Sequence, residues 1–486
     1  MPKNGRTLEK QDLVVIGLLT VLSTGILFYG IYPLGMGVEF DSIFYFNAAE
    51  RMARGEDLKL FNNFYYSAWP PLYPALIALC SRLCGEDPFH ASLYLHVLLH
   101  GLLMAMLGYF LFGNLQNKSI AILGYLSFAI SPVIFSFSSL AYSELPFIVA
   151  TLPLFLSFRD PSAPKRIWTA VISGILASLA RYIGISVIIT YALFFIKKKV
   201  PIRKILMFGM LSSVPLGLWL LRNYLVVGSL AGSRNISRTP FLINFKLFFR
   251  ILVDWASAFS WKASGFVVLL AMILGLTLML KKERKYPAPL EPISIFILIY
   301  SFFLLFAFFL IALPQIKDRF MFPLYVPLSF LAFIVLDQWS RRDQKLKPWI
   351  IMFLLFFLAD KALASFTLIQ QWRHDGRTVT TRLYHSPLAS FLNTYVFDGK
   401  IISNKPHMVY FLSHKISTFS PREHSRNGRR GPLRRRNTSN GSGKLFLIWF
   451  RDSFGRQAPL EELRTRFSFL TIREFEKATV FQITPR

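Results

Sequence analysis

Charged residues are scarce in this chain of 486 residues, and cysteine is almost absent. Only 17% of the residues are Asp, Glu, Lys or Arg, whereas 53% are hydrophobic and 16% are aromatic. A soluble protein of this length carries more charge than this on its surface. Several uninterrupted apolar runs reach the roughly 20 residues that a helix needs to cross a bilayer. The composition therefore predicts a polytopic α-helical membrane protein.

Acidic residues are also few, because 26 Asp and Glu accompany 55 Lys and Arg. Such an excess of positive charge can indicate nucleic-acid binding, but no basic-aromatic binding module is present. The basic residues gather instead in short loops between apolar runs, so we expect contacts with membrane lipids and no nucleic acid. The two cysteines, Cys80 and Cys84, lie one helical turn apart. A bridge between them would constrain little, and buried free thiols are expected.

The distribution of basic loops predicts how the chain crosses the membrane. The basic leader before the first apolar run is expected to stay in the cytoplasm, and the run to remain as a span. Arg181 and Gly184 interrupt one segment whose two ends are both basic, which predicts two short helices meeting near Arg181. Counted in this way, about 11 crossings are expected. The spans are residues 13–33, 91–112, 119–137, 142–158, 167–196 (the broken pair), 205–227, 265–280, 292–313, 321–336 and 349–369.

The first outer loop, residues 34–90, is the longest polar and aromatic segment in the first half of the chain. It places two acids, Glu39 and Asp41, shortly after the first span. Asp41 is predicted to be the N-cap of an amphipathic helix on the membrane surface, and Gly55 to end that helix. The capping role alone would explain an aspartate at this position.

From residue 370 the composition changes to that of a small soluble domain. Short apolar runs at 400–403, 408–411, 445–450 and 480–483 are typical of strands, and 388–393 and 459–469 of helices. We therefore expect a transmembrane domain at 1–369 and an extracytoplasmic α/β domain at 370–486. A basic tract rich in Gly, Arg, Asn and Ser is predicted to be a disordered loop at 425–443.

Several motifs together resemble the GT-C-type membrane glycosyltransferases. The resemblance is to the relatives of dolichyl-phosphate-mannose protein mannosyltransferases and aminoarabinose transferases, the family 39-like enzymes, and it covers nearly the whole chain. Each motif is weak alone, and their order and shared outer-face placement carry the match. The motifs are Glu-Phe-Asp-Ser-Ile-Phe-Tyr (39–45), Trp-Pro-Pro-Leu-Tyr-Pro (69–74), Ser-Glu-Leu-Pro (143–146), Ala-Arg-Tyr-Ile-Gly (180–184), Leu-Arg-Asn-Tyr (221–224), Lys-Asp-Arg-Phe (317–320) and a strand-turn-helix pattern at 401–411.

The resemblance implies transfer of a sugar from a polyprenyl-phosphate donor, outside the cytoplasm and with inversion. Asp41 would be the general base, with Glu39 assisting it. Many relatives carry two adjacent acids in this loop, whereas Phe40 separates them here. Asp41 aligns better than Glu39 because a helix follows it directly, and this leaves the role of Glu39 less defined.

Four charged residues at or near the outer ends of spans are candidates for binding the donor phosphate or another substrate group. Arg181 lies between apolar runs, and Glu144 lies near the end of a span, where unpaired charge is costly. Arg181 could instead form a structural pair with Glu144 or Asp41. Arg222 and Arg319 lie at span ends, where simple interfacial anchoring is the alternative.

Aromatic residues and metal ligands add further candidates. Tyr65 and Trp69 could stack on a sugar, although aromatic residues are common at membrane interfaces. The metal requirement is left open: a divalent cation could be held by Asp41 and Glu144. His96 and His100 share a helix face, but no acidic signature accompanies them.

The sequence therefore predicts a cell-envelope glycosyltransferase of the plasma membrane, mannosyltransferase-like in its relationships. The acceptor could be a protein, a lipid or a polysaccharide. Two alternatives stay open: a transporter or flippase of a lipid-linked intermediate, and a non-catalytic envelope assembly protein. A transporter usually shows paired repeats with interrupted helices, and only one broken pair is evident. The shared-site hypothesis requires the loop of residues 37–74 to lie near Arg181, Arg222 and Arg319.

Overall fold

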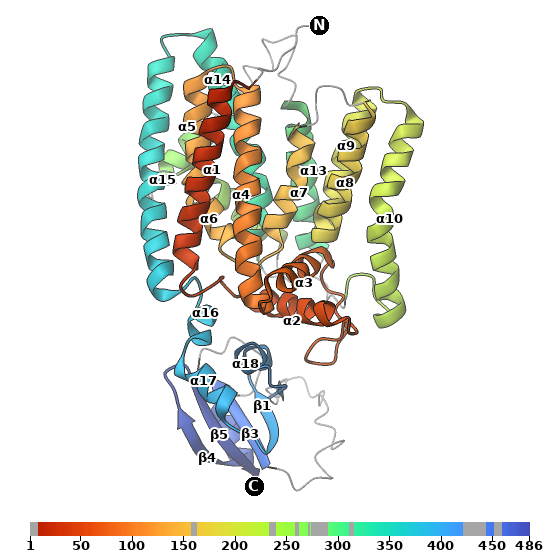
Figure 1. The fold of residues 1–486 in the computed structure, drawn as a ribbon, viewed down its shortest axis with the longest axis vertical. Helices are drawn as coiled ribbons and strands as arrows, with labels where there is room; N and C mark the ends of the chain where they lie inside the picture. The colour runs from red at the N-terminus through yellow and green to blue at the C-terminus, as the bar shows by residue number, and fades with distance from the viewer. Residues whose placement is uncertain are drawn as a thin grey trace.

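Apolar helices form a bundle at one end of the molecule, and a small α/β unit lies at the other end (Figure 1). The structure is a computed structural model. It describes residues 8–156, 163–232, 240–257, 262–270, 273, 290–310, 315–420, 444–451 and 459–486. Of the expected span at 265–280, only residues 265–270 and 273 lie within the described residues, and the predicted disordered loop at 425–443 lies outside them.

Six helices of the described chain are long and apolar enough to cross a membrane, and a bent pair would make a seventh. The pair meets at 43°, next to Pro132, which cannot donate a backbone hydrogen bond. A polytopic helical membrane protein is thereby confirmed, whereas about 11 crossings stays a prediction. The long helices are α1 (Lys10–Ile31), α4 (Pro88–Asn114), α10 (Ile202–Val227), α13 (Leu290–Leu310), α14 (Asp318–Arg342) and α15 (Lys347–Asp375), and the bent pair is α5 (Lys118–Ala129) with α6 (Pro132–Ser138).

Shorter helices fill the bundle, among them the pair that the sequence places around Arg181. Helix α8 (Pro164–Ala180) ends where Arg181 becomes extended, a 3₁₀ turn covers Tyr182–Gly184, and α9 (Ile185–Lys197) follows. The two helices lie side by side (Figure 1). The prediction of two short helices meeting at Arg181 is confirmed. Helices α7 (Glu144–Leu156) and α11 (Phe241–Ala256) complete this part.

Helices α2 (Phe40–Arg54) and α3 (Leu72–Cys84) lie across the end of the bundle that faces the α/β unit (Figure 1). Gly55 ends α2 in the left-handed conformation, as expected. The N-cap assignment of Asp41 is wrong, because Glu39 caps α2 and Asp41 lies in its first turn. The Ser42 hydroxyl accepts a hydrogen bond from the Glu39 amide at 3.1 Å, and α2 begins two residues earlier than expected, at Phe40.

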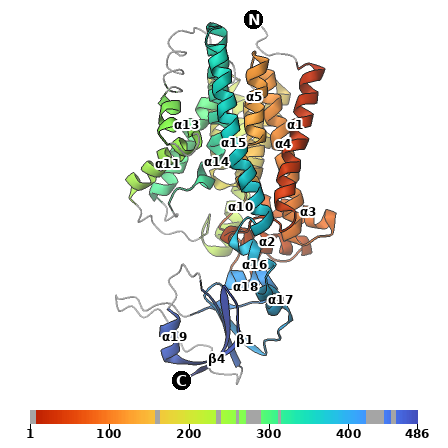
Figure 2. The same cartoon turned by 90° about the vertical axis from the view of Figure 1, so that its left-hand side faces the viewer.

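The α/β unit is built on one five-stranded sheet of order β2-β1-β3-β5-β4. Strand β1 pairs in parallel with β2 and β3, and β5 pairs antiparallel with β3 and β4. Helix α15 leads directly into α16 and this unit (Figure 2). Its elements are α16 (Val379–Tyr384), α17 (Pro387–Thr394), β1 (Gly399–Ser403), α18 (Pro406–Ser413), β2 (Thr418–Phe419), β3 (Lys444–Phe450), α19 (Leu460–Arg466), β4 (Phe467–Glu474) and β5 (Ala478–Pro485).

Two expected elements of this unit differ from the structure. Residues 408–411 were predicted as a strand but belong to α18, which Pro406 opens at its first turn. The strand-turn-helix pattern implied by the resemblance at 401–411 is therefore the correct interpretation. The helix expected at 459–469 ends at Arg466, where β4 begins.

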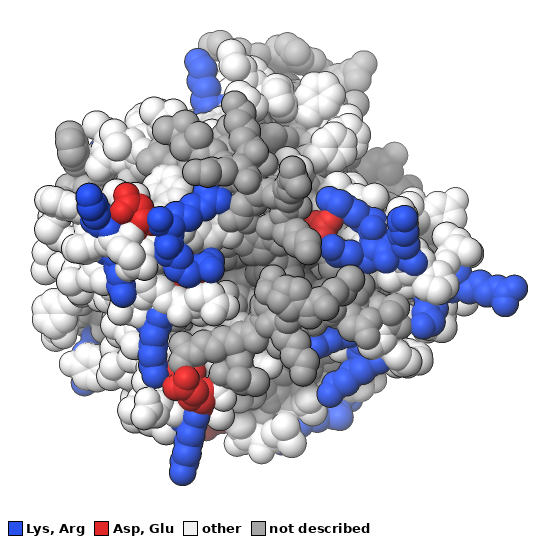
Figure 3. All heavy atoms as spheres, turned by 90° about the horizontal axis from the view of Figure 1, so that it is seen from above, with Lys and Arg blue, Asp and Glu red and all other residues white. Residues whose placement is uncertain are grey.

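The bundle end opposite the α/β unit is rich in positive charge. Figure 3 shows this face with more Lys and Arg than Asp and Glu among its described residues. Lys197 and Lys198 lie there and hold Glu291 at 2.7 and 2.5 Å. A cytoplasmic position for this face follows from the positive-inside rule and stays a prediction.

Candidate active site

Two arginines and two acids from four parts of the chain meet in one ion-pair chain. Arg319 Nη2 lies 2.5 Å from Asp41 Oδ2, and Arg319 Nε lies 3.7 Å from Glu144 Oε1. The same Glu144 oxygen lies 2.5 Å from Arg181 Nη1. The Glu144 side chain is only 1% exposed, and a carboxylate at such depth needs cations beside it. Pairing of Arg181 with Glu144, one of the two sequence-based alternatives, is therefore present.

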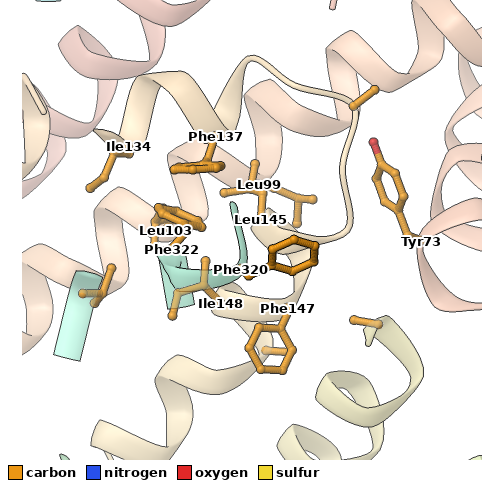
Figure 4. Packing of buried hydrophobic residues seen from close by; sticks show 14 of the residues in the cluster. Tyr73, Leu99, Leu103, Ile134, Phe137, Leu145, Phe147, Ile148, Phe320 and Phe322 are labelled. Carbon is orange, nitrogen blue, oxygen red and sulfur yellow. The ribbon is translucent and has the colours of Figure 1, made fainter. Parts of the chain in front are cut away.

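Each member of this ion-pair chain stands at the end of a helix. Asp41 lies in the first turn of α2, Glu144 opens α7, and Arg319 lies in the first turn of α14, while Arg181 lies in the break between α8 and α9. Apolar packing holds these ends together. Figure 4 shows the aromatic and aliphatic side chains between α4, α6, α7 and α14, where Phe137 stacks on Phe322 at 4.4 Å.

Hydroxyl groups and rings surround the ion pairs. Arg181 Nη1 donates to Ser143 Oγ at 3.3 Å, and Tyr45 Oη lies 3.4 Å from the same oxygen. The Arg319 guanidinium lies over the Tyr142 ring at 4.6 Å. Burial raises the pKa of Tyr45 and of Tyr142 well above the ordinary tyrosine value, so both hydroxyls keep their protons at neutral pH.

Asp41 and Arg319 border a pocket with a volume of about 830 Å³. Its polar wall also contains Glu39, Lys317, Asp318 and Arg377. Glu39 is exposed, whereas the Asp41 side chain is 15% exposed. The rest of the wall is largely apolar and comes from α6, the segment that follows it, α11 and α15: Pro132, Val133, Phe137, Leu140, Trp255, Ala364 and Leu368.

A second cavity, of about 480 Å³, has an almost wholly apolar lining. Trp255 borders both cavities, so the apolar one begins beside the charged pocket. Helices α11, α14 and α15 supply most of its wall. Apolar lining residues include Leu252, Tyr325, Leu328, Phe333, Trp349, Phe353 and Leu354.

Arg222, Tyr65 and Trp69 meet at another part of the first outer loop. Arg222 Nη1 donates to the Tyr66 carbonyl at 2.7 Å, and its guanidinium lies 5.9 Å from the Tyr65 ring. Trp69 packs against Phe44 at 5.5 Å. None of these three borders the 830 Å³ pocket. The first outer loop therefore contacts Arg222 through Tyr65 and Tyr66, and its Asp41 pairs with Arg319. It reaches Arg181 indirectly, because Tyr45 and Arg181 both contact Ser143 Oγ.

Both ring nitrogens of His96 and of His100, on α4, have hydrogen-bond partners. His96 contacts the Tyr73 hydroxyl at 2.8 Å, and His100 contacts Ser23 at 3.0 Å. Within the described residues, the group with metal-like spacing is Glu86, Asp87 and His90, away from the pocket. A metal-binding role of Asp41 or Glu144 stays a prediction. Cys80 and Cys84 are free, as expected, but the expected burial is wrong, because Cys84 is exposed and Cys80 is only half-buried.

Sequence reasoning missed Arg377, which follows α15 and faces Glu39 in the pocket. A single arginine beyond a span carries no signal of its own, because interfacial arginines are common. Tyr142 and Ser143 were also missed as neighbours of the charged groups, although Ser143 belongs to the 143–146 motif. Its place beside Glu144 in that motif is the signal that could have found it.

No protein-family model and no curated protein matches the sequence of this chain. Its fold is nevertheless similar to that of solved membrane enzymes. ArnT from Cupriavidus metallidurans bound to undecaprenyl phosphate aligns with a TM-score of 0.65 and 11% identity over 98% of both chains. The same protein in the apo state aligns with a TM-score of 0.61 and 12% identity, over 96% of this chain and 97% of the other.

The archaeal oligosaccharyltransferase AglB from Archaeoglobus fulgidus, in complex with an inhibitory peptide and a dolichol-phosphate, is also similar. It aligns with a TM-score of 0.50 and 10% identity over 84% of this chain and 64% of AglB. Both neighbours are GT-C glycosyltransferases. At this identity the likeness shows the fold, and the GT-C-type fold expected from the sequence is confirmed.

Proposed function

We propose that the protein is a membrane glycosyltransferase that moves a sugar from a polyprenyl-phosphate donor to an acceptor hydroxyl. In this proposal the reaction takes place on the extracytoplasmic face, where the α/β domain also lies, and the N-terminus is cytoplasmic. The acceptor belongs to a protein, a lipid or a polysaccharide. The observation that carries the proposal is the 830 Å³ pocket, in which Asp41 faces cations beside an apolar cavity.

The apolar cavity suits the polyprenyl chain of such a donor. It opens beside the charged pocket at Trp255 and is lined by side chains that offer dispersion contacts without polar demands. A phosphate attached to the chain would then lie among the cations of the pocket. The bound undecaprenyl phosphate of ArnT, a protein with the same fold, supports a lipid phosphate as the ligand class.

The chemistry of transfer needs one base and one site of positive charge. The acceptor oxygen attacks the anomeric carbon, its proton passes to Asp41, and the bond from that carbon to the phosphate oxygen breaks. The electron pair leaves with the polyprenyl phosphate, so a single displacement inverts the anomeric centre. Arg319 holds Asp41 Oδ2 and thereby orients the carboxylate toward the pocket.

The test compares the wild-type protein with Asp41→Asn. Purified protein is incubated with radiolabelled polyprenyl-phosphate hexoses and a membrane extract, and labelled acceptor is measured. Asn cannot accept the proton, so labelling should fall roughly 100-fold or more. A melting curve for each protein separates lost chemistry from lost folding.

Other results would remove this assignment. Equal labelling by wild type and Asp41→Asn would eliminate Asp41 as the base. Labelled lipid that changes leaflet without any transfer would identify a flippase instead. An absence of labelling with every donor, together with normal lipid binding, would favour the non-catalytic assembly protein.

A further inference from the structure

Arg377 differs from Arg181, Arg222 and Arg319, the three arginines that the sequence marks as phosphate candidates, in what its side chain contacts. Its Nε donates to Ser139 Oγ at 3.1 Å, and its guanidinium lies 4.8 Å from the Trp372 ring. Within the described part of the chain, no carboxylate lies within ion-pair distance of it. Glu39, which Arg377 faces in the pocket, lies beyond that distance. A partly buried guanidinium without a direct ion-pair partner is unfavourable until an anion approaches it.

The other three arginines are already engaged by protein acceptors. Arg319 holds Asp41 and lies near Glu144, and Arg181 holds Glu144. Arg222 donates to the Tyr66 carbonyl and to Asn223 Oδ1 at 3.0 Å. An incoming phosphate would have to compete with these partners, whereas both terminal nitrogens of Arg377 are without a protein acceptor among the described residues.

The backbone at Gly37 leaves space for the Arg377 side chain. A Cβ at Gly37 would lie 2.4 Å from Arg377 Cγ and 2.7 Å from Leu140 Cδ2, so only glycine leaves room for the arginine stem. The Gly37 amide donates to the Ser139 carbonyl at 2.8 Å. Ser139 thus contacts both the Arg377 guanidinium and the segment of residues 36–39 that precedes α2, which we call the strap.

The residues that follow Arg377 hold the same strap. Thr378 Oγ1 donates to the Val38 carbonyl at 3.0 Å, and Thr381 Oγ1 donates to the Met36 carbonyl at 2.7 Å. The strap leads directly to Glu39 and Asp41. Arg377 is therefore held in a fixed place relative to the candidate base, which a ligand-binding group requires.

We propose that Arg377 binds the phosphate of the polyprenyl-phosphate donor, with Lys317 as a second cation in the pocket wall. The planar guanidinium can present two N–H groups to two phosphate oxygens, a geometry in which arginine is preferred over lysine. Arg319 then serves to orient Asp41 and not to carry the donor. This inference rests on the proposed function.

Binding of undecaprenyl phosphate to the purified full chain in detergent tests the assignment. Arg377→Gln should raise the dissociation constant about 10- to 100-fold, since hydrogen bonds to charged groups are worth about 1.5–3 kcal/mol. The dissociation constant of Arg377→Lys should lie between those of wild type and Arg377→Gln. The matched control is Arg373→Gln, four residues earlier, whose side chain contacts Tyr29 and does not border the pocket; its affinity should equal that of wild type.

Two further ligands identify what Arg377 recognises. Undecaprenol lacks the phosphate, so Arg377→Gln should bind it as well as wild type does, which also shows that the variant is folded. Inorganic phosphate should compete with undecaprenyl phosphate on wild type only weakly, because it gains nothing from the apolar cavity. Strong competition by phosphate alone would overturn the lipid donor as the source of the anion.

The outcomes separate this inference from the proposed function. Unchanged affinity of Arg377→Gln, with transfer still dependent on Asp41, would overturn the role of Arg377 and leave the transferase standing. Equal losses for undecaprenyl phosphate and undecaprenol would show a structural effect and overturn the phosphate contact. Failure of the wild-type chain to bind undecaprenyl phosphate at all would overturn both.

Discussion

At the scale of single residues, Glu144 is the carboxylate that two guanidinium groups share. One of its oxygens lies 2.5 Å from Arg181 and 3.7 Å from Arg319, and the side chain is 1% exposed. Such a group is costly without cations, and the cations are equally costly without it. Glu144 therefore sets the positions of both arginines, and through Arg319 it positions Asp41.

Replacing Glu144 with Gln should destabilise the protein by about 3–5 kcal/mol, because it leaves two cations without their shared carboxylate. Thermal unfolding of the purified protein measures the loss. The double variant with Arg181→Gln should be less destabilised than the sum of the two single variants, since it removes one of the uncompensated charges. Additive losses would mean that the two side chains do not interact.

Single residues could be predicted where burial of charge makes them conspicuous, as with Arg181 and Glu144. The capping residue could not be predicted, because Glu39 and Asp41 both precede an apolar helical pattern. The return contact from Ser42 decides between them, and the sequence gives no distance for it. Arg377 enters the pocket only because Gly37 and Ser139 lie against it, which is a contact between residues more than 200 positions apart.

At the scale of elements, the break between α8 and α9 brings Arg181 to the ion pairs. Gly184 lies close to the preceding helix, where a Cβ would stand 2.2 Å from the Ala177 carbonyl oxygen. The Ala177 carbonyl also accepts the Arg181 amide at 3.1 Å, so it cannot move freely. Glycine at this position therefore lets the chain turn back on itself without opening the break.

Gly184→Ala should destabilise the protein by about 1–3 kcal/mol, because the added methyl group must push α8 and α9 apart. The backbone of Gly184 has φ −61°, so alanine meets no conformational strain there and the contact alone is tested. Gly217→Ala on α10 is the control, because nothing lies within 4 Å of its Cβ position. Equal melting temperatures for the two variants would contradict the close approach.

Elements with long apolar runs were predictable, because their length is set by the bilayer. Short runs were not. The four apolar residues at 408–411 fit a strand as well as a buried helix, and only the preceding Pro406 and the packing of α18 on α2 resolve the choice. The apolar cavity at Trp255 likewise depends on helix packing that periodicity does not specify.

At the scale of the whole molecule, the α/β domain is docked on the helix that carries Asp41. Tyr410 of α18 donates to Glu50 at 2.6 Å and stacks on Phe61 at 4.7 Å. His407 packs edge-on against Phe40 at 4.9 Å, beside the candidate base. Movement of this domain would therefore disturb the first turn of α2.

The docking should weaken in acid because of His407. Burial, reinforced by the nearby Lys405 charge, lowers the pKa of His407 to about 4 from its ordinary 6.5. Between these values the unfolded chain binds a proton that the folded chain does not, so stability falls as the pH falls. From pH 7.5 to pH 5 the loss should reach about 2 kcal/mol.

Thermal unfolding of the purified protein at pH 7.5 and pH 5 measures this loss, with His407→Gln as the test variant. Gln does not titrate, so the variant should lose less stability on acidification than wild type does. His385→Gln is the matched substitution control, because it replaces an exposed histidine of the same domain. Equal pH dependence in wild type and His407→Gln would mean that His407 does not hold the domain in place. A smaller dependence in the variant, accompanied by steadier transfer activity at pH 5, would link the docked domain to the placement of Asp41.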